Sequence, residues 1–119
     1  MSRISVYEAS DLLKKLFDER TPVKAFFTSP AKARIRLDGF IVGATIDQGL
    51  YIGDCLPPES PANWINVFPF REGECIFDYG EKREITEDMR IHLTTDLGES
   101  ALIIRFIVTD ELLSIFFTV

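Results

Sequence analysis

The segment Lys32-Ala33-Arg34-Ile35-Arg36-Leu37-Asp38 alternates strictly between polar and apolar residues. Successive side chains of a β-strand point to opposite faces of a sheet, so this period of two predicts a strand with one buried and one solvated face. The same period, or a short apolar run, recurs along most of the chain after Pro22. We therefore expect a protein built mainly from β-strands.

The other predicted strands bring the total to about eight or nine. They span Val23 to Thr28, Phe40 to Ile46, Leu50 to Gly53, Trp64 to Phe70, Glu74 to Tyr79, Met89 to Thr95, Ala101 to Thr109 and Leu112 to Thr118. Turn signals such as Asp47-Gln48-Gly49 are short enough to favour antiparallel neighbours. We expect a small antiparallel meander that forms a closed or nearly closed β-barrel, because closure protects edge strands.

One helix is expected before the strands, over about residues 6–20. Ser5 and Glu8 have the spacing of a capping box, which marks the start of a helix. Apolar residues then recur with helical period and make one buried stripe: Ala9, Leu12, Leu13, Leu16 and Phe17. Pro22 cannot continue the helical ladder. The helix is thus amphipathic, and we expect it to cover an open end or edge of the barrel.

The chain of 119 residues is the size of one domain, and we expect a single domain over residues 1–119, with the barrel from about residue 23 onward. The stretch Cys55 to Asn63 contains Pro57, Pro58 and Pro61 and is expected to form a long irregular loop. A domain junction is the alternative, but each half then has few strands.

Two apolar strands suggest how the barrel is covered. Ala101 to Val108 is apolar on both faces apart from Arg105, which predicts a central strand between the barrel interior and the helix. In Leu112 to Val119, Phe116 is expected to face away from the core. That outward ring is the basis for expecting self-association through this strand into a homo-oligomer.

The compartment follows from what the sequence lacks. No signal peptide is recognisable in the first residues, so we expect a cytoplasmic protein in which Cys55 and Cys75 are reduced thiols. The longest apolar stretches are far shorter than the roughly 18 to 20 residues that cross a bilayer. No membrane insertion is expected.

No motif points to catalysis, a metal or a cofactor. His92 is the single histidine and is interpreted as a surface or structural residue. A dense series of carboxylates between Glu72 and Asp88 lacks the spacing of a calcium loop and is interpreted as a solvated acidic rim. The glycines form no phosphate-binding motif. Trp64, Phe68 and Phe70 share one strand face, where core packing is favoured over a base-stacking platform.

Charge is distributed unevenly along the chain, whose formal net charge is −6. Residues 1–36 carry eight basic and four acidic groups, whereas residues 37–119 carry five basic and fifteen acidic ones. Four basic residues fall on adjacent predicted strands and form the candidate anion-binding patch: Lys24, Lys32, Arg34 and Arg36. A solvated strand face is the alternative. The overall acidity argues against non-specific nucleic-acid binding, so no DNA binding is expected.

The stretch Leu12-Leu13-Lys14-Lys15-Leu16-Phe17-Asp18-Glu19-Arg20-Thr21-Pro22-Val23-Lys24-Ala25-Phe26-Phe27 resembles two families of small barrels that begin with a helix. One is the N-terminal barrel domain of flagellar-brake proteins, which accompanies a PilZ domain. The other is the Hfq/Sm-like family of RNA-binding barrels. The chain has neither the Arg-x-x-x-Arg nor the Asp-x-Ser-x-x-Gly pattern of PilZ domains, and no Tyr-Lys-His motif of Hfq.

The resemblance and the residues together imply a non-catalytic regulatory or protein-interaction barrel. Its expected partners are another protein or a second copy of the chain. The alternative is an Sm-like binder of RNA or another anionic ligand that uses the basic patch. An enzyme with a pocket in the barrel is the third reading and would depend on His92. We expect no enzyme and no cofactor.

Overall fold

Eight strands form one continuous antiparallel sheet within residues 1–56 and 62–118, the part of the chain that the computed structural model describes. The order across the sheet is β1-β6-β7-β8-β2-β3-β4-β5. The strands are β1 (Ser2–Ile4), β2 (Pro22–Thr28), β3 (Arg34–Thr45), β4 (Gly49–Gly53), β5 (Ile65–Phe68), β6 (Cys75–Glu81), β7 (Ser100–Phe106) and β8 (Glu111–Phe117). The mainly β fold class is thereby confirmed.

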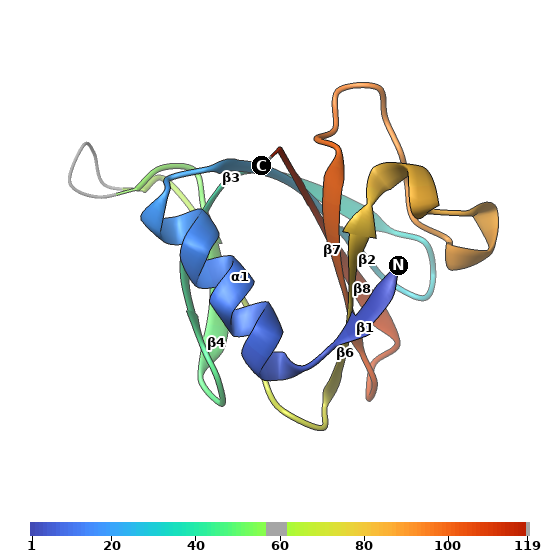
Figure 1. The fold of residues 1–119 in the computed structure, drawn as a ribbon, viewed down its shortest axis with the longest axis horizontal. Coiled ribbons are helices and arrows are strands. Elements are labelled where there is room, and N and C mark those ends of the chain that lie inside the picture. The colour runs from blue at the N-terminus through green and yellow to red at the C-terminus, as the bar shows by residue number, and fades with distance from the viewer. Residues whose placement is uncertain (57–61, 119) are drawn as a thin grey trace.

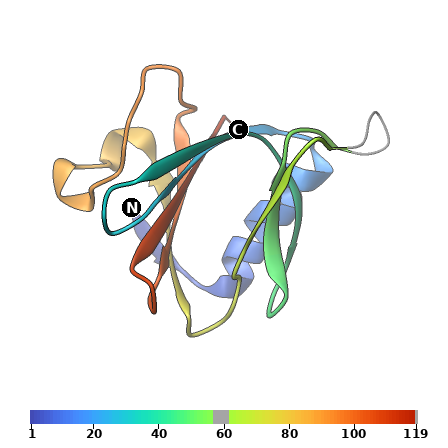
Figure 2. The ribbon, with the colours of Figure 1, turned by 180° about the vertical axis from the view of Figure 1, so that it is seen from behind.

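The sheet consists of two meanders joined in the middle. Strands β2 to β5 pair in chain order, as do β6 to β8, and β2 pairs with β8 to connect the two sets. Strands β5 and β6 do not pair, so β1 and β5 remain as edges and hydrogen bonds do not close the barrel. Figures 1 and 2 show a strongly curved sheet, with β3 arching over the top. The predicted proline loop at Pro57, Pro58 and Pro61 lies outside the described residues.

The predicted helix is α1 (Val6–Asp18), which follows the short strand β1 that sequence patterns missed. The capping box is present: the Glu8 backbone N–H donates to Ser5 Oγ, and the Ser5 N–H donates to Glu8 Oε1, both at 3.1 Å. Past the helix, Arg20 adopts a left-handed conformation (φ 54°) and Pro22 begins β2. Helix α1 lies across the opening on the concave side of the sheet (Figure 1) and packs against β3 and β6.

The inner core lies between α1 and the concave face of the sheet. Four helix residues are buried: Val6, Ala9, Leu13 and Leu16. Of the predicted stripe, Leu12 is only partly buried, and the expectation is wrong for Phe17, whose side chain is 40% exposed. The four buried residues meet inward side chains of strands β2 to β8, among them Phe68 of β5, and Phe70 from the segment after β5, while Trp64 packs at the margin of this core. Core packing of these three aromatic residues is thus confirmed. Burial also raises the pKa of the Cys75 thiol, which is not joined to Cys55 by a disulfide.

A second apolar cluster covers the outer face of β2, β7 and β8. We call residues 82–99 the outer segment; it contains the short 3-10 helices η1 (Lys82–Glu84) and η2 (Glu87–Met89). Its ends are tied by a hydrogen bond of 2.6 Å from the Lys82 N–H to the Glu99 carbonyl. Ile85, Ile91 and Leu97 of this segment belong to the outer cluster with five residues of the sheet, namely Phe26, Ala101, Ile103, Leu112 and Phe116.

The outer segment corrects three expectations. The predicted strand from Met89 to Thr95 is wrong, because this stretch pairs with no strand among the described residues. The second face of β7 is covered by the outer segment rather than by the helix. Phe116 is fully buried, with an exposed fraction of 0%, so self-association through β8 loses the exposed ring that motivated it.

The predicted strands from Lys32 to Asp38 and from Phe40 to Ile46 are one strand, β3, that bends. Gly39 permits the close approach of β3 to β4, since a Cβ at this position would lie 2.1 Å from the Gly53 carbonyl oxygen. The register with β4 also shifts between Ile41 and Gly43. None of the helices in the described part of the chain is long and apolar enough to cross a bilayer.

Candidate functional site

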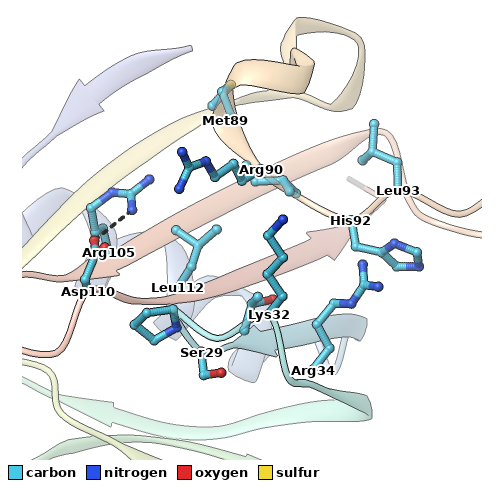
Figure 3. A pocket seen from close by; sticks show the side chains of 13 residues that line it. Ser29, Lys32, Arg34, Met89, Arg90, His92, Leu93, Arg105, Asp110 and Leu112 are labelled. Atoms are coloured by element: carbon cyan, nitrogen blue, oxygen red, sulfur yellow. Dashed lines mark hydrogen bonds and ion pairs between the residues drawn. The ribbon is translucent and has the colours of Figure 1, made fainter.

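A hollow of about 520 Å³ lies on the outer face of the sheet, at the end of the outer segment that contains residues 89–93. Its lining residues come from the β2–β3 turn, the outer segment and the β7–β8 hairpin: Thr28, Ser29, Pro30, Lys32, Arg34, Met89, Arg90, Ile91, His92, Leu93, Arg105, Asp110 and Leu112. Four of these are Lys or Arg and one is Asp. We refer to this feature as the cationic hollow (Figure 3).

Strand register builds the floor of the cationic hollow. Arg34 of β3 pairs with Thr28 of β2, Thr28 with Leu112 of β8, and Leu112 with Arg105 of β7. Directly opposed residues in an antiparallel sheet point to the same face, so these four side chains form one row. Three strand spacings, about 14 to 15 Å measured along the curved sheet, separate the backbones of the two arginines.

The β2–β3 turn provides one wall. Ser29 fixes this turn: its carbonyl accepts from the Lys32 N–H at 2.9 Å, and its Oγ accepts from the Ala33 N–H at 3.2 Å. Lys32 adopts a left-handed conformation there (φ 65°), which an L-residue rarely does without support from its surroundings. In Figure 3 the Lys32 and Arg34 side chains rise from this wall toward the outer segment.

The outer segment provides the opposite wall. Arg90 ends η2 in a left-handed conformation (φ 58°), and its N–H donates to the Glu87 carbonyl at 3.1 Å. Ile91 next to it belongs to the outer apolar cluster and anchors the wall to the sheet. The Arg90 side chain projects over the floor from the side opposite Lys32 (Figure 3).

The charges in the cationic hollow are only partly balanced. At one end Arg105 Nη1 lies 3.3 Å from Asp110 Oδ1, so this end holds a carboxylate paired with a guanidinium. By contrast, the side chains of Lys32, Arg34 and Arg90 form no ion pair and no hydrogen bond with any residue in 1–56 or 62–118. All three are solvent-exposed. Three unpaired cations therefore border one hollow in a chain whose net charge is −6.

Lys24 and Arg36, the other two residues of the predicted patch, have a different role. Both bind Asp96 of the outer segment: Lys24 Nζ lies 3.1 Å and Arg36 Nη2 2.5 Å from Asp96 Oδ2. Thr94 also donates to this carboxylate. Hydrogen bonds from Arg36, Thr94 and Lys24 hold the pKa of the Asp96 carboxyl well below its usual range. Lys24 and Arg36 therefore fasten the outer segment to the sheet.

His92 is half-buried beside this ion-pair cluster. Its ring meets the ring of Phe26 edge-on, with 5.2 Å between centroids. The Arg36 guanidinium lies over the same Phe26 ring at 5.3 Å from its centroid, a cation–π geometry. His92 thus packs the outer segment onto the sheet, in agreement with its interpretation as a structural residue.

The sequence placed two of the lining cations, Lys32 and Arg34, in the candidate patch and missed Arg90, Arg105 and Asp110. Arg105 did carry a signal, since it interrupts an otherwise apolar strand. Arg90 and Asp110 carried none that local patterns detect, because both lie in turns far along the chain from Lys32. The patch also lies on the outer face of the sheet, whereas α1 packs on the inner face.

Several of the acidic residues between Glu72 and Asp88 each contact a different partner. Glu72 accepts from the Tyr7 hydroxyl at 2.8 Å, Asp78 pairs with Arg3, and Glu84 pairs with the N-terminal amine. Within residues 1–56 and 62–118, no three His, Cys, Asp or Glu side chains are grouped so that they could hold a metal ion.

Comparison with known proteins finds no match for this chain among family models, curated proteins or solved structures.

Proposed function

We propose that this chain is a non-catalytic regulatory domain that binds an anionic ligand in the cationic hollow. The observation that carries the proposal is the convergence of Lys32, Arg34 and Arg90, without acidic partners, on one concave site of an acidic protein. Like charges that share a site repel one another, and a bound anion would remove that repulsion. Arginine and lysine are also the usual ligands of phosphate and carboxylate groups.

The size and build of the hollow support a specific site rather than a solvated surface. Its volume of about 520 Å³ falls within the range of roughly 300 to 1,000 Å³ that is typical of small-molecule pockets. The two walls are held by backbone hydrogen bonds at Ser29 and by the apolar anchor Ile91. The hydrogen bonds of Ser29 fix the backbone of the turn that carries Lys32, and a cation on a fixed turn loses less conformational freedom on binding than one on a flexible loop.

The proposal assigns no chemistry to His92, whose ring packs against Phe26. In the regulatory role expected from the sequence, the bound anion would be the regulating ligand. A bound anion would connect the β2–β3 turn to the outer segment. Ligand binding could in this way change the conformation of the outer surface.

Calorimetric titration with inorganic pyrophosphate tests the proposal. We expect binding at low salt that weakens as sodium chloride is raised, because exposed charges are screened. The double variant Lys32→Gln with Arg34→Gln should bind at least about tenfold more weakly, since each charged hydrogen bond contributes about 1.5 to 3 kcal/mol.

The matched control is Lys14→Gln with Lys15→Gln, which removes the same charge from the exposed face of α1. It should bind pyrophosphate as the unaltered protein does. An equal loss in both double variants would show that net charge, not the hollow, attracts the anion, and would overturn the proposal. Absence of binding at low salt would overturn it as well.

A further inference from the structure

The two ends of the cationic hollow differ in charge. Lys32 and Arg34 stand at one end without acidic partners, and Arg90 extends from the other wall over the floor, with its guanidinium toward Arg105 (Figure 3). At the far end of the floor row, Arg105 is already neutralised by Asp110. One end therefore favours a strongly charged anion, while the other offers a donor and an acceptor to an uncharged polar group.

The spacing of the ends limits what a single ligand can reach. Three strand spacings, about 14 to 15 Å measured along the curved sheet, separate the backbones of Arg34 and Arg105 across β3, β2, β8 and β7. A ligand that uses the whole floor must be elongated, with its charge concentrated at one end.

Apolar side chains line the middle of the hollow, although Leu112 is only 5% exposed there. Leu112 forms the centre of the floor beside Thr28, and Met89 and Ile91 contribute from the outer segment. A flat ring would bury apolar surface here without leaving a polar group unpaired. An all-polar ligand would gain nothing from these side chains.

The surroundings disfavour a long polyanion. Glu87 and Asp88 are exposed on η2, immediately before the wall that carries Arg90, and residues 37–119 contain three times as many acidic as basic side chains. The affinity of an RNA strand depends on basic side chains that neutralise its phosphates along the whole bound length. Beyond the hollow, the strand would instead lie against acidic side chains. The cations are confined to one small site.

We propose that the ligand is a nucleoside diphosphate, a class that unites these requirements in one small molecule. Its diphosphate binds Lys32, Arg34 and Arg90, its rings lie over Leu112, and a hydroxyl or amino group of the nucleoside reaches the Arg105–Asp110 pair. This inference rests on the proposed anion-binding function and specifies its ligand.

Affinity measurements by calorimetry with three kinds of probe test the inference. The probes are the four common ribonucleoside diphosphates (ADP, GDP, CDP and UDP), inorganic pyrophosphate, and a decauridylate strand. We expect at least one nucleoside diphosphate to bind at least about tenfold more tightly than pyrophosphate, and more tightly than decauridylate, because only the nucleotide fills both ends of the hollow.

The variant Asp110→Asn tests the neutral end. Asp110 is in a left-handed conformation (φ 56°), which asparagine tolerates well, so the fold should be retained. The change leaves Arg105 unneutralised, and we expect pyrophosphate to bind more tightly while the preference for the nucleotide falls below about threefold. Asp18→Asn removes one negative charge from the end of α1 and should leave both affinities unchanged.

Each outcome separates the two proposals. If no probe binds, the anion-binding function itself is wrong. If pyrophosphate binds as tightly as every nucleoside diphosphate, the hollow is a simple anion site and only the nucleotide inference is overturned. Tighter binding of decauridylate would make the chain an RNA binder and overturn it too. An unchanged nucleotide preference in Asp110→Asn would refute the role given to the Arg105–Asp110 end.

Discussion

The guanidinium of Arg36 donates to the carboxylate of Asp96, with 2.5 Å between Arg36 Nη2 and Asp96 Oδ2, although 60 residues of chain separate them. The same carboxylate accepts from Lys24 and Thr94. Asp96 is therefore the point at which the outer segment is fastened to β2 and β3. Because Ile91 and His92 lie on the same segment, this contact also supports the wall of the cationic hollow.

Replacement of Asp96 by asparagine should weaken this attachment. Asp96→Asn leaves Lys24 and Arg36 without their shared counter-charge, so we expect a lower midpoint of urea unfolding and faster amide exchange in residues 91–97. Asp88→Asn, an exposed change on η2 with the same charge difference, is the control and should alter neither. Equal exchange rates in Asp96→Asn and the unaltered protein would contradict the role of Asp96.

The ion pairs of Asp96 should also make the stability of the fold depend on pH. Hydrogen bonds from Arg36, Thr94 and Lys24 lower the pKa of Asp96 in the folded state, so folding favours its ionised form. The stabilisation is complete above the unfolded-state pKa of about 3.9 and is lost as the pH falls through the lower folded-state pKa. The difference in urea midpoint between the unaltered protein and Asp96→Asn should thus be constant from pH 7 to 5 and shrink below about pH 4. A difference that persists unchanged at pH 3 would argue against this linkage.

Phe116 offers a test of the outer cluster. Its ring is fully buried and lies 6.5 Å from that of Phe26, centroid to centroid. Phe116→Ala should therefore lower the free energy of unfolding by about 3 to 5 kcal/mol, the usual cost of a phenylalanine cavity. Phe17→Ala, on the exposed side of α1, is the control and should cost far less. If Phe116→Ala had only a small effect on the free energy of unfolding and abolished self-association in light scattering, the sequence-based expectation that this ring is exposed and mediates self-association would be supported instead.

Elements whose causes lie within a few residues could be predicted from the sequence. The capping box at Ser5 and Glu8 gave the start of α1, and the alternation around Arg34 gave β3 and the direction of its basic side chains. Strand β1 was missed because three residues are too few to display a period. The stretch from Met89 to Thr95 alternates like a strand but pairs with none in the described residues, and its Ile91 packs instead on the outer face of the sheet.

The candidate site could be predicted only in part, because it depends on long-range register. Arg34 and Arg105 share one row only because β2 pairs with β8, and no local pattern indicates that pairing. Lys24 and Arg36 carry the same charge as their neighbours Lys32 and Arg34 in the predicted patch. They bind Asp96 because the outer segment folds back over them. Thus local chemistry identified the basic residues, and topology determined which of them stay unpaired.

Two glycines of β3, Gly39 and Gly43, should differ in how much an alanine substitution changes the free energy of unfolding. A Cβ on Gly39 would lie 2.1 Å from the Gly53 carbonyl oxygen, and this backbone atom cannot move away alone. Gly39→Ala should therefore destabilise the protein by about 1 to 3 kcal/mol. At Gly43 the nearest atom to a new Cβ is Tyr51 Cδ2, at 3.7 Å. Gly43→Ala should be neutral or stabilising by about 0.4 to 1 kcal/mol. Urea unfolding of both variants checks this, and equal effects would mean that β3 and β4 approach less closely at Gly39 than the structure has them.

Ligand binding should make the outer segment less mobile. Residues 90–97 form neither helix nor strand, so few of their backbone N–H groups are held and their amide hydrogens should exchange readily. An anion that binds Lys32 and Arg34 on one wall and Arg90 on the other ties this stretch to the β2–β3 turn. We expect saturating pyrophosphate to slow exchange in residues 90–95 by at least about threefold and to leave β4 unaffected. In Arg90→Gln, compared at equal occupancy, the slowing should be smaller, because the contact to that wall is lost. Slowing that is equal across the whole chain would indicate general stabilisation instead, and no slowing at all would mean that the anion does not connect the two walls.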